Sequence, residues 1–242
     1  MSGHSRWTQI KHKKAGSDAK RGALFSKIGR MIAVAAASGG PDPRANAKLR
    51  SAVDQARGAG MSKDVIERAI ARASGEGGSA RGQEVEYEAY GPGASAWLIA
   101  GITDSPNRTT TELKRILTES GGRLAEARNV GWMFDRRVAY EFSAQERGAD
   151  AAELALIDAG AEDTAVREDR VTALVPLAAA PAFLATVASR GFSPETSAMI
   201  YVPKSPITLL PQDLALAHAL ASNLEDHPDV TEVWTNIENL EG

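Results

Sequence analysis

Residues 138–202 read VAYEFSAQERGADAAELALIDAGAEDTAVREDRVTALVPLAAAPAFLATVASRGFSPETSAMIYV and hold the pattern that decides the fold. Short runs with strand character alternate there with longer runs of helical periodicity. The expected elements are strands at 138–142, 164–167, 171–175 and 197–202, and helices at 149–159 and 179–189. Their order is βαββαβ, which is the order of a split ferredoxin-like unit.

The segments on either side of this stretch predict further strands and helices. Before it we expect strands at Val85–Tyr90, Ala96–Thr103 and Gly131–Phe134 and a helix at Thr109–Ser120. After it we expect a helix at Gln212–Leu224 and a strand at Val230–Ile237. Because these last two elements have no partners of their own, they should complete a second such unit with the segment before the stretch. Residues 137–202 would then be a domain inserted into a domain of residues 84–136 and 203–242.

Residues 1–76 follow a helical pattern instead. Apolar spacing favours one helix that ends at Gly39-Gly40-Pro41, a second over Arg44–Arg57, and a third capped by Ser62. Residues 1–16 show no apolar period, so we expect a mobile arm there, and Ser74–Gln83 is typical of a linker. The expected fold class is α+β multidomain, with an N-terminal three-helix all-α domain and two ferredoxin-like α/β domains, one inserted in the other.

Charge is divided unevenly along the chain. The 242 residues carry a net charge of −3, yet residues 1–83 hold 16 basic and 6 acidic side chains and residues 84–242 hold 12 and 25. A basic end attracts polyanions, whereas an acidic body repels them. The pattern predicts a nucleic-acid binder that holds its target through its N-terminal third, with acidic domains that meet unidentified protein partners.

The basic side chains of the first thirty residues are the predicted nucleic-acid contacts, with Trp7 available to stack on a base. A solvated tail is the alternative. The contact residues we predict are Arg6, Trp7, Lys11, Lys13, Lys14, Lys20, Arg21, Lys27 and Arg30. The sequence shows no recognition helix with base-reading side chains on one face, so the expected contacts are to phosphates. Such contacts leave duplex DNA and structured RNA, including ribosomal RNA, both open.

A second candidate anion contact lies where a helix is expected to follow a strand, at Asn107, Arg108 and Thr109. Free backbone N–H groups at a helix start can hold a phosphate or a carboxylate together with an arginine. Ordinary N-capping by Asn107 is the simpler interpretation, and we favour it.

The composition argues against catalysis. The absence of cysteine excludes a disulfide framework, a thiolate zinc site and a cysteine nucleophile. The four histidines show no ligand spacing, so neither a metal nor another cofactor is expected. Glu84, Glu86 and Glu88 alternate along a strand and are interpreted as a solvated edge. With no recognisable nucleophile, general base or phosphate loop, we predict that the protein is not an enzyme.

The most apolar stretch is 171–188, VTALVPLAAAPAFLATVA. It contains Pro176 and Pro181 and is better explained as a strand followed by a helix than as a membrane span. The basic N-terminal residues lead into polar residues and not into an apolar signal region. We therefore expect a cytoplasmic protein without membrane contact.

Dense short motifs support a family resemblance. They are Gly3-His4-Ser5-Arg6-Trp7, Ile10-Lys11-His12-Lys13-Lys14, Asp18-x-Lys20-Arg21-Gly22, Phe25-Ser26-Lys27, Gly39-Gly40-Pro41-Asp42-Pro43, Ile66-Glu67-Arg68-Ala69-Ile70, Tyr87-Glu88-x-Tyr90-Gly91-Pro92-Gly93, Asn107-Arg108-Thr109, Gly121-Gly122 and Trp132-Met133-Phe134. Through these motifs the chain closely resembles the YebC-type family. The matching motifs are dense as far as about residue 135, and beyond it mainly the spacing of the residues matches.

The resemblance implies a three-domain, cytoplasmic, non-enzymatic protein with a helical N-terminal domain. Members of the family are usually described as DNA-binding transcriptional regulators, mitochondrial relatives as translational activators, and bacterial ones have been linked to the ribosome. The first hypothesis is therefore a nucleic-acid-binding regulator of gene expression, acting on DNA or, alternatively, on the ribosome. A small-ligand-binding or enzymatic α/β protein with an incidental basic arm is the remote alternative.

Overall fold

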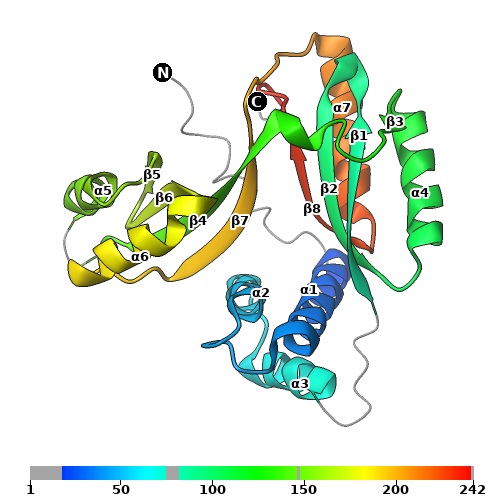
Figure 1. Cartoon of the computed structure of the whole chain (residues 1–242). Helices are drawn as coiled ribbons and strands as arrows, with labels where there is room; N and C mark the ends of the chain where they lie inside the picture. The colour runs from blue at the N-terminus through cyan, green and yellow to red at the C-terminus, as the bar shows by residue number, and fades with distance from the viewer. Residues whose placement is uncertain (1–17, 75–81, 146–147, 241–242) are drawn as a thin grey trace. The chain divides into compact units, whose positions relative to one another are not determined.

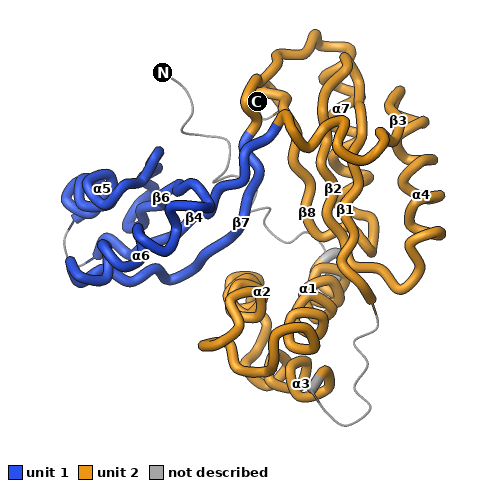
Figure 2. Tube along the Cα trace, in the orientation of Figure 1, with its two compact units in different colours: residues 1–13, 134–202 blue, residues 14–133, 203–242 orange. Residues whose placement is uncertain are grey.

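The computed structural model describes residues 18–74, 82–145 and 148–240, and Figure 1 shows their helices and strands. The chain forms an α+β protein with N-terminal helices and two four-stranded sheets, which confirms the predicted fold class at this level. Contacts divide it into two compact units, coloured separately in Figure 2. Among the described residues, unit 1 holds residues 134–202, and unit 2 holds residues 18–133 together with residues 203–240.

Unit 2 begins with three helices, α1 (Asp18–Gly39), α2 (Ala47–Gly58) and α3 (Lys63–Ser74). They pack around a shared apolar core that includes Ile28, Ile32, Leu49, Val53, Ala56 and Ile66. The second helix starts at Ala47 and not at Arg44, because Asn46 caps it. The Asn46 side chain accepts a bond from the Leu49 amide at 3.1 Å and donates to the Ala35 carbonyl at 2.7 Å, so one buried amide joins the start of α2 to α1.

The first sheet of unit 2 has the strand order β3-β1-β2-β8. Its elements are β1 (Gln83–Tyr90), β2 (Ala96–Thr103), β3 (Arg123–Leu124) and β8 (Val230–Thr235), with helices α4 (Pro106–Glu119) and α7 (Pro211–Asp226). Trp97 and Ile99 on β2 are fully buried in one core with Leu113 of α4 and Leu220 of α7. Both helices therefore cover the same face of the sheet.

The elements of this sheet follow the order of the predicted segments, apart from the position of the third strand, but that order is not the one expected for a second βαββαβ unit. β1 and β2 form a hairpin across η1 (Pro92–Ala94), and the helices come later, so the order is ββαβ followed by αβ. This is not the βαββαβ order expected for a second unit of the same kind. The predicted strand at Gly131–Phe134 is mostly wrong, because residues Gly131–Met133 form a 3-10 turn, η2, and the next strand starts at Phe134.

Unit 1 contains the second sheet, with the strand order β5-β6-β4-β7. Its elements are β4 (Phe134–Ser143), α5 (Ala149–Asp158), β5 (Asp163–Arg167), β6 (Arg170–Pro176), η3 (Leu177–Ala179), α6 (Ala180–Ser189) and β7 (Thr196–Pro203). The core joins Leu156 of α5 and Phe183 of α6 to Phe142 and Val171 of the sheet. Tyr140 stacks on Phe183 with ring centroids 5.6 Å apart.

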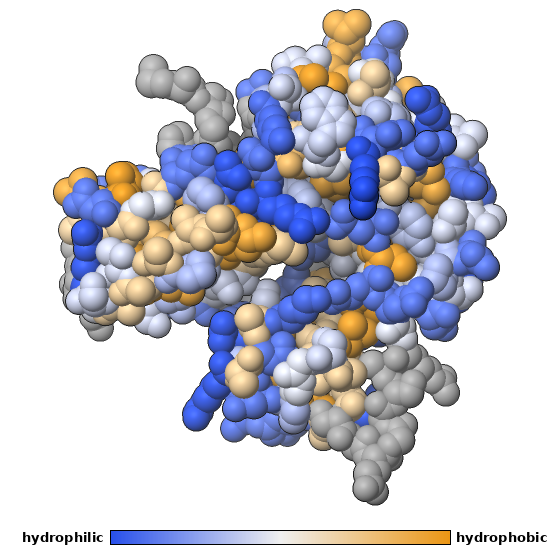
Figure 3. Space-filling view, in the orientation of Figure 1, coloured by the Kyte–Doolittle hydropathy of each residue, from blue (hydrophilic) through white to orange (hydrophobic). Residues whose placement is uncertain are grey.

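The apolar stretch 171–188 forms a strand and a helix in unit 1, as the sequence predicts. Across the part of the chain that the structure describes, no helix is both long enough and apolar enough to cross a membrane. Unit 1 does expose hydrophobic side chains on α5, namely Leu154 and Ile157, and Figure 3 shows hydrophobic surface at that end of the unit.

Replacing Gly101 by alanine should destabilise unit 2. The register between β2 and β8 shifts at Ala100/Gly101, and a Cβ atom added to Gly101 would lie 2.5 Å from the Asp229 carbonyl oxygen. That carbonyl is fixed because it accepts a bond from the Ile102 amide at 2.8 Å. We expect Gly101→Ala to lower the free energy of unfolding by about 2 kcal/mol, measured by urea unfolding.

Gly58→Ala is the matched control for this prediction. Gly58 ends α2, and an added Cβ would meet no atom within 4 Å. Alanine there should leave the stability unchanged or raise it by up to about 1 kcal/mol. Equal effects of the two substitutions would contradict a steric role for Gly101.

Candidate nucleic-acid interface

The predicted contacts of the arm fall outside the described residues. This holds for Arg6, Trp7, Lys11, Lys13 and Lys14, and for the side chain of Lys20, whose backbone lies in α1. Among the described residues, Arg21 is exposed on the first turns of α1, as a phosphate contact requires.

Lys27 and Arg30 bind another part of the protein. The Lys27 Nζ atom donates to the Glu225 carbonyl, and Arg30 donates to the Pro228 carbonyl. Arg30 also pairs with the Asp229 carboxylate at 3.2 Å. Burial, more than any other influence, lowers the pKa of Lys27. Two of the predicted phosphate contacts therefore tie α1 to the connection between α7 and β8.

Asp229 is the acceptor at the centre of this connection. Its side chain is only 2% exposed, and its carboxylate accepts bonds from Arg108 at 2.8 Å and from the Thr109 hydroxyl at 2.8 Å. Burial alone would raise the pKa of Asp229, but bonds from Arg108, Thr109 and Thr103 outweigh burial and lower the pKa below its usual value. The carboxylate is thus held in its charged form.

The predicted anion contact at the start of α4 is occupied by the protein itself. Arg108 and Thr109 lie together as expected, but the anion they hold is Asp229. The expected N-cap is wrong. α4 begins at Pro106, so Ser105 is the cap residue, it makes no side-chain cap bond, and Asn107 lies inside the first turn.

Glu112, His227 and Asp229 form a cluster that the sequence did not indicate. Their donor atoms all lie within 4.8 Å of one another. The His227 Nδ1 atom accepts a bond from the Asp229 amide at 3.1 Å, which leaves Nε2 to donate to Glu112 at 2.9 Å. Because Arg108 and Arg30 already occupy the Asp229 oxygens, the cluster is explained as a network of hydrogen bonds and ion pairs that needs no metal ion.

The outer faces of the helical domain carry further exposed cations. These side chains, which the sequence analysis did not single out, are Arg44, Lys48, Arg50, Arg57, Lys63, Arg68 and Arg72. Some form ion pairs at the surface, such as Lys48 with Glu84 at 2.7 Å and Lys63 with Glu67 at 3.7 Å. Exposed pairs of this kind contribute about 0–1 kcal/mol, so a phosphate can compete for these cations. Their positions on the polar faces of the predicted helices could have identified them from the sequence.

Glu84 and Glu86 on β1 are exposed, as expected for a solvated edge, but Glu88 is half-buried and is an exception. Its carboxylate accepts bonds from the backbone amides of Arg128 at 2.7 Å, Val130 at 2.5 Å and Gly131 at 3.0 Å. Burial would raise the pKa of Glu88, but these backbone bonds lower it overall. Glu88 is therefore the anchor of the loop at residues 125–133.

Replacing Glu88 by glutamine should weaken this anchor in a pH-dependent way. A carboxylate whose pKa is lowered in the folded state stabilises the fold above its unfolded pKa, about 4.3, and this contribution is lost as the pH falls through the lower folded value. We expect Glu88→Gln to cost about 2 kcal/mol at pH 7, and the difference to shrink below about pH 4. Urea unfolding at several pH values measures it. The exposed Glu126→Gln in the same loop should change little at any pH, and an equal loss there would contradict the role of Glu88.

Comparison with known proteins places this geometry in a family. A profile described as the TACO1/YebC protein N-terminal domain matches residues 5–76, and one described as the TACO1/YebC second and third domain matches residues 82–237. A probable transcriptional regulatory protein of Treponema denticola is 40% identical over 242 residues, covering 100% of this chain and 98% of the relative. One of Fervidobacterium nodosum is 42% identical over 240 residues, covering 98% and 94%.

A solved structure agrees with these matches. The crystal structure of a conserved hypothetical protein from Aquifex aeolicus superposes with a TM-score of 0.80 at 35% sequence identity, and the match covers 96% of each chain. Its fold is therefore similar along nearly the whole length. Together, the motifs in the first 135 residues, the two profile matches and these relatives show that the chain belongs to the TACO1/YebC family.

Proposed function

We propose that this protein is a non-enzymatic regulator of gene expression that binds nucleic acid through its N-terminal third and acts as a DNA-binding transcriptional regulator. The main observation that supports this proposal is the separation of charge along the chain, with a net charge of +10 over residues 1–83 and −13 over residues 84–242. The exposed cations on the described helices support it, and so does the name of its relatives, probable transcriptional regulatory protein.

The nucleic-acid contacts in this proposal, to phosphates or bases, are the arm and the outer faces of the helices. Arg6, Trp7, Lys11, Lys13, Lys14, Lys20 and Arg21 keep this role. Lys27 and Arg30 are less suited to it, because they bind the segment 225–229. A nucleic acid would have to displace that segment to reach them.

The second candidate is a translation factor that binds ribosomal RNA with the same domain. The observation that favours it is the exposed surface of α3, where Asp64 and Glu67 lie between Lys63 and Arg68 in the sequence. Acids on that face repel phosphates, so α3 is poorly suited to lie in a DNA major groove. Cations spread over several elements suit the irregular backbone of a folded RNA.

We also propose that the protein catalyses no reaction and binds no cofactor. The hollow between α4 and α7 is lined by Arg115, Ile116, Glu119, Asn223, Asp226 and His227. This lining includes no hydroxyl or thiol nucleophile, and His227 is already bound to Glu112. A cytoplasmic location and unidentified protein partners for the acidic domains complete the proposal.

The proposal also includes the domain arrangement. We take residues 137–202 as a ferredoxin-like domain inserted into a domain made of residues 84–136 and 203–242, after a helical domain of residues 1–76. The strand order β5-β6-β4-β7, with two helices on its core, supports the inserted domain. The pairing of β8 with β2 supports the joining of the two outer segments.

Crosslinking in growing cells, followed by sequencing of both the DNA and the RNA recovered with the protein, tests the function. Recovery of discrete promoter DNA fragments, without enrichment of ribosomal RNA, would support the transcriptional role. Recovered fragments of ribosomal RNA that map to one region of the folded RNA would contradict the transcriptional role and support the translational role. Recovery of neither above the level of a variant lacking residues 1–16 would refute nucleic-acid binding.

A further inference from the structure

The loop that Glu88 anchors carries the exposed side chains of Arg128 and Trp132. The exposed Arg123 and Lys204 and the half-buried Tyr90 lie beside it, and we call these five residues the Trp132 surface. We propose that the Trp132 surface binds unpaired nucleotides of a single-stranded nucleic acid, as a contact separate from the basic N-terminal third. This inference rests on the proposed function, because it assigns a second contact to the same class of ligand.

Trp132 is the central group of this surface. It is 66% exposed, although a tryptophan ring is large and mostly apolar. Its indole N–H already donates to the Asn129 carbonyl at 3.0 Å, so what the ring offers to a ligand is its flat face. Nucleobases stack on such faces whatever their sequence.

The loop holds the ring in a defined position. Three backbone amides of residues 128–131 donate to Glu88, and Val130 beside Trp132 is fully buried. A side chain held by a fixed loop loses little conformational freedom when it binds, which favours affinity. The exposure of Trp132 is therefore a property of an ordered segment.

Cations and a second ring lie around Trp132. The Tyr90 hydroxyl donates to the Asn129 carbonyl at 3.2 Å, which is the same carbonyl that the indole uses. The Arg123 guanidinium lies 5.1 Å from the centre of the Tyr90 ring. The Lys204 Nζ atom donates to the Trp132 carbonyl at 2.8 Å. Two rings and two cations thus lie in one connected neighbourhood.

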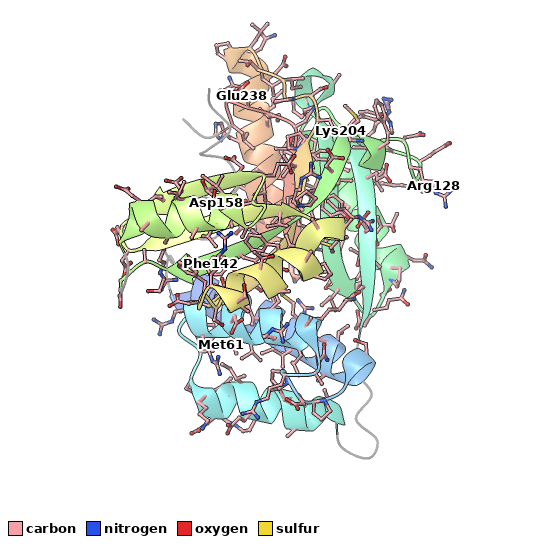
Figure 4. The ribbon with its side chains drawn as sticks, turned by 60° about the vertical axis from the view of Figure 1, so that its left-hand side comes forward. Met61, Arg128, Phe142, Asp158, Lys204 and Glu238 are labelled. Atoms are coloured by element: carbon pink, nitrogen blue, oxygen red, sulfur yellow. The ribbon has the colours of Figure 1, made fainter. Side chains whose placement is uncertain are left out.

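Arg128 extends this neighbourhood into solvent, as Figure 4 shows, where Lys204 is labelled as well. Its backbone has φ 72°, the left-handed region that glycine adopts readily and arginine does not. A backbone conformation of this kind is retained when the surroundings enforce it, and it is frequent at binding sites. Here the amide of Arg128 is held by Glu88.

The charge of the surroundings favours a nucleic acid over a protein surface as the ligand. Residues 84–242 hold 25 acidic and only 12 basic side chains, yet three of the basic ones gather here. Between Arg123 and Trp132 the one exposed acid is Glu126, since Glu88 is bound to the loop backbone. Cations that flank stacking rings match a strand whose phosphates flank its bases.

Binding of short oligonucleotides to the full chain, followed by fluorescence anisotropy, tests the inference. The probes are single-stranded RNA and single-stranded DNA of one unstructured sequence, together with the matching DNA duplex. Trp132→Ala should weaken single-strand binding at least fivefold, since stacking on one base contributes on that order, and change duplex binding less. Leu210→Ala is the matched control, because Leu210 is also 66% exposed and lies outside the surface.

Arg128→Gly separates binding from folding. Glycine relieves the left-handed backbone, so this variant should unfold at the same or a higher urea concentration than the natural chain. It should nevertheless bind single strands about threefold to tenfold more weakly, because one phosphate contact is lost. Arg115→Ala, an exposed arginine on α4, should leave binding unchanged within twofold.

The outcomes divide as follows. Loss of affinity for both single strands, or for RNA alone, supports the surface, and the second result names RNA as its ligand. Unchanged affinity in both Trp132→Ala and Arg128→Gly, while charge reversal in the N-terminal third abolishes binding, overturns this inference and leaves the proposed function intact. Absence of binding by the natural chain to any probe overturns both.

Discussion

Reversing the charge of Lys13, Lys14, Lys20 and Arg21 to glutamate should weaken nucleic-acid binding by at least about 100-fold at 0.1 M salt. Each cation that neutralises a phosphate releases condensed counterions, and glutamate adds repulsion to that loss. The effect is large because four contacts change together. Anisotropy of a labelled duplex and of a labelled structured RNA, titrated with natural and variant protein, measures it.

The control for charge reversal comes from the acidic body. Lys114 and Arg115 are exposed on α4, and their change to glutamate alters the net charge without touching the N-terminal third. This variant should bind within about threefold of the natural chain at the same salt. If reversal in the acidic body weakens binding as much as reversal in the N-terminal third, net charge and not the location of the cations controls binding.

Replacing Asp229 by asparagine should lower the free energy of unfolding of unit 2 by about 2–4 kcal/mol at pH 7. The buried carboxylate accepts bonds from Arg108, Arg30 and Thr109, and asparagine turns an amide N–H₂ toward at least one of these donors. The two arginines are partly exposed, at 47% and 35%, and solvent keeps the loss below that of a fully buried pair. Urea unfolding followed by tryptophan fluorescence reports on this unit, where Trp97 and Trp234 are buried.

Lowering the pH should also remove the stabilising contribution of the Asp229 carboxylate. The pKa of Asp229 is lowered in the folded state, so its contribution is complete above the unfolded pKa of about 3.9 and is lost as the pH falls through the lower folded value. The free energy of unfolding of the natural chain should therefore fall as the pH drops from the unfolded pKa through the lower folded pKa. The Asp229→Asn variant should not show the part of this decrease that comes from Asp229.

Asp104→Asn is the matched control for Asp229. Asp104 also pairs with Arg108, at 3.0 Å, but its side chain is 61% exposed. Exposed ion pairs contribute little, so this variant should stay within about 0.5 kcal/mol of the natural chain. Equal losses for the two aspartates would show that burial and the shared donors are not what makes Asp229 important.

The sequence predicted the local elements well. Helical and strand periodicities located the three N-terminal helices, the β1–β2 hairpin and the order of elements in unit 1, because each depends on a repeating apolar pattern within one segment. The start of α2 was misplaced because the Asn46 side chain caps the helix by accepting a bond from the Leu49 amide, while its NH₂ group donates to the Ala35 and Gly40 carbonyls. An apolar period does not predict such contacts.

The candidate site was predicted less completely, because its contacts join distant residues. Asp229 lies 121 residues from Arg108 and 199 from Arg30, and His227 lies 115 from Glu112. A run of basic residues shows that cations are present, but it does not show whether each one meets a phosphate or a carboxylate of its own chain. Lys27 and Arg30 illustrate this, since both were predicted as phosphate contacts and both bind residues 225–229.

The most direct test of the central claim is to map which residues touch nucleic acid. Ultraviolet crosslinking of the full chain in cells, digestion, and mass spectrometry of the nucleotide-bearing peptides identifies them. We expect adducts on peptides from residues 1–30, with a second, weaker group at residues 123–133 if the Trp132 surface also binds. Adducts confined to residues 84–242, with none on the first thirty residues, would contradict the claim that the basic N-terminal third holds the nucleic acid.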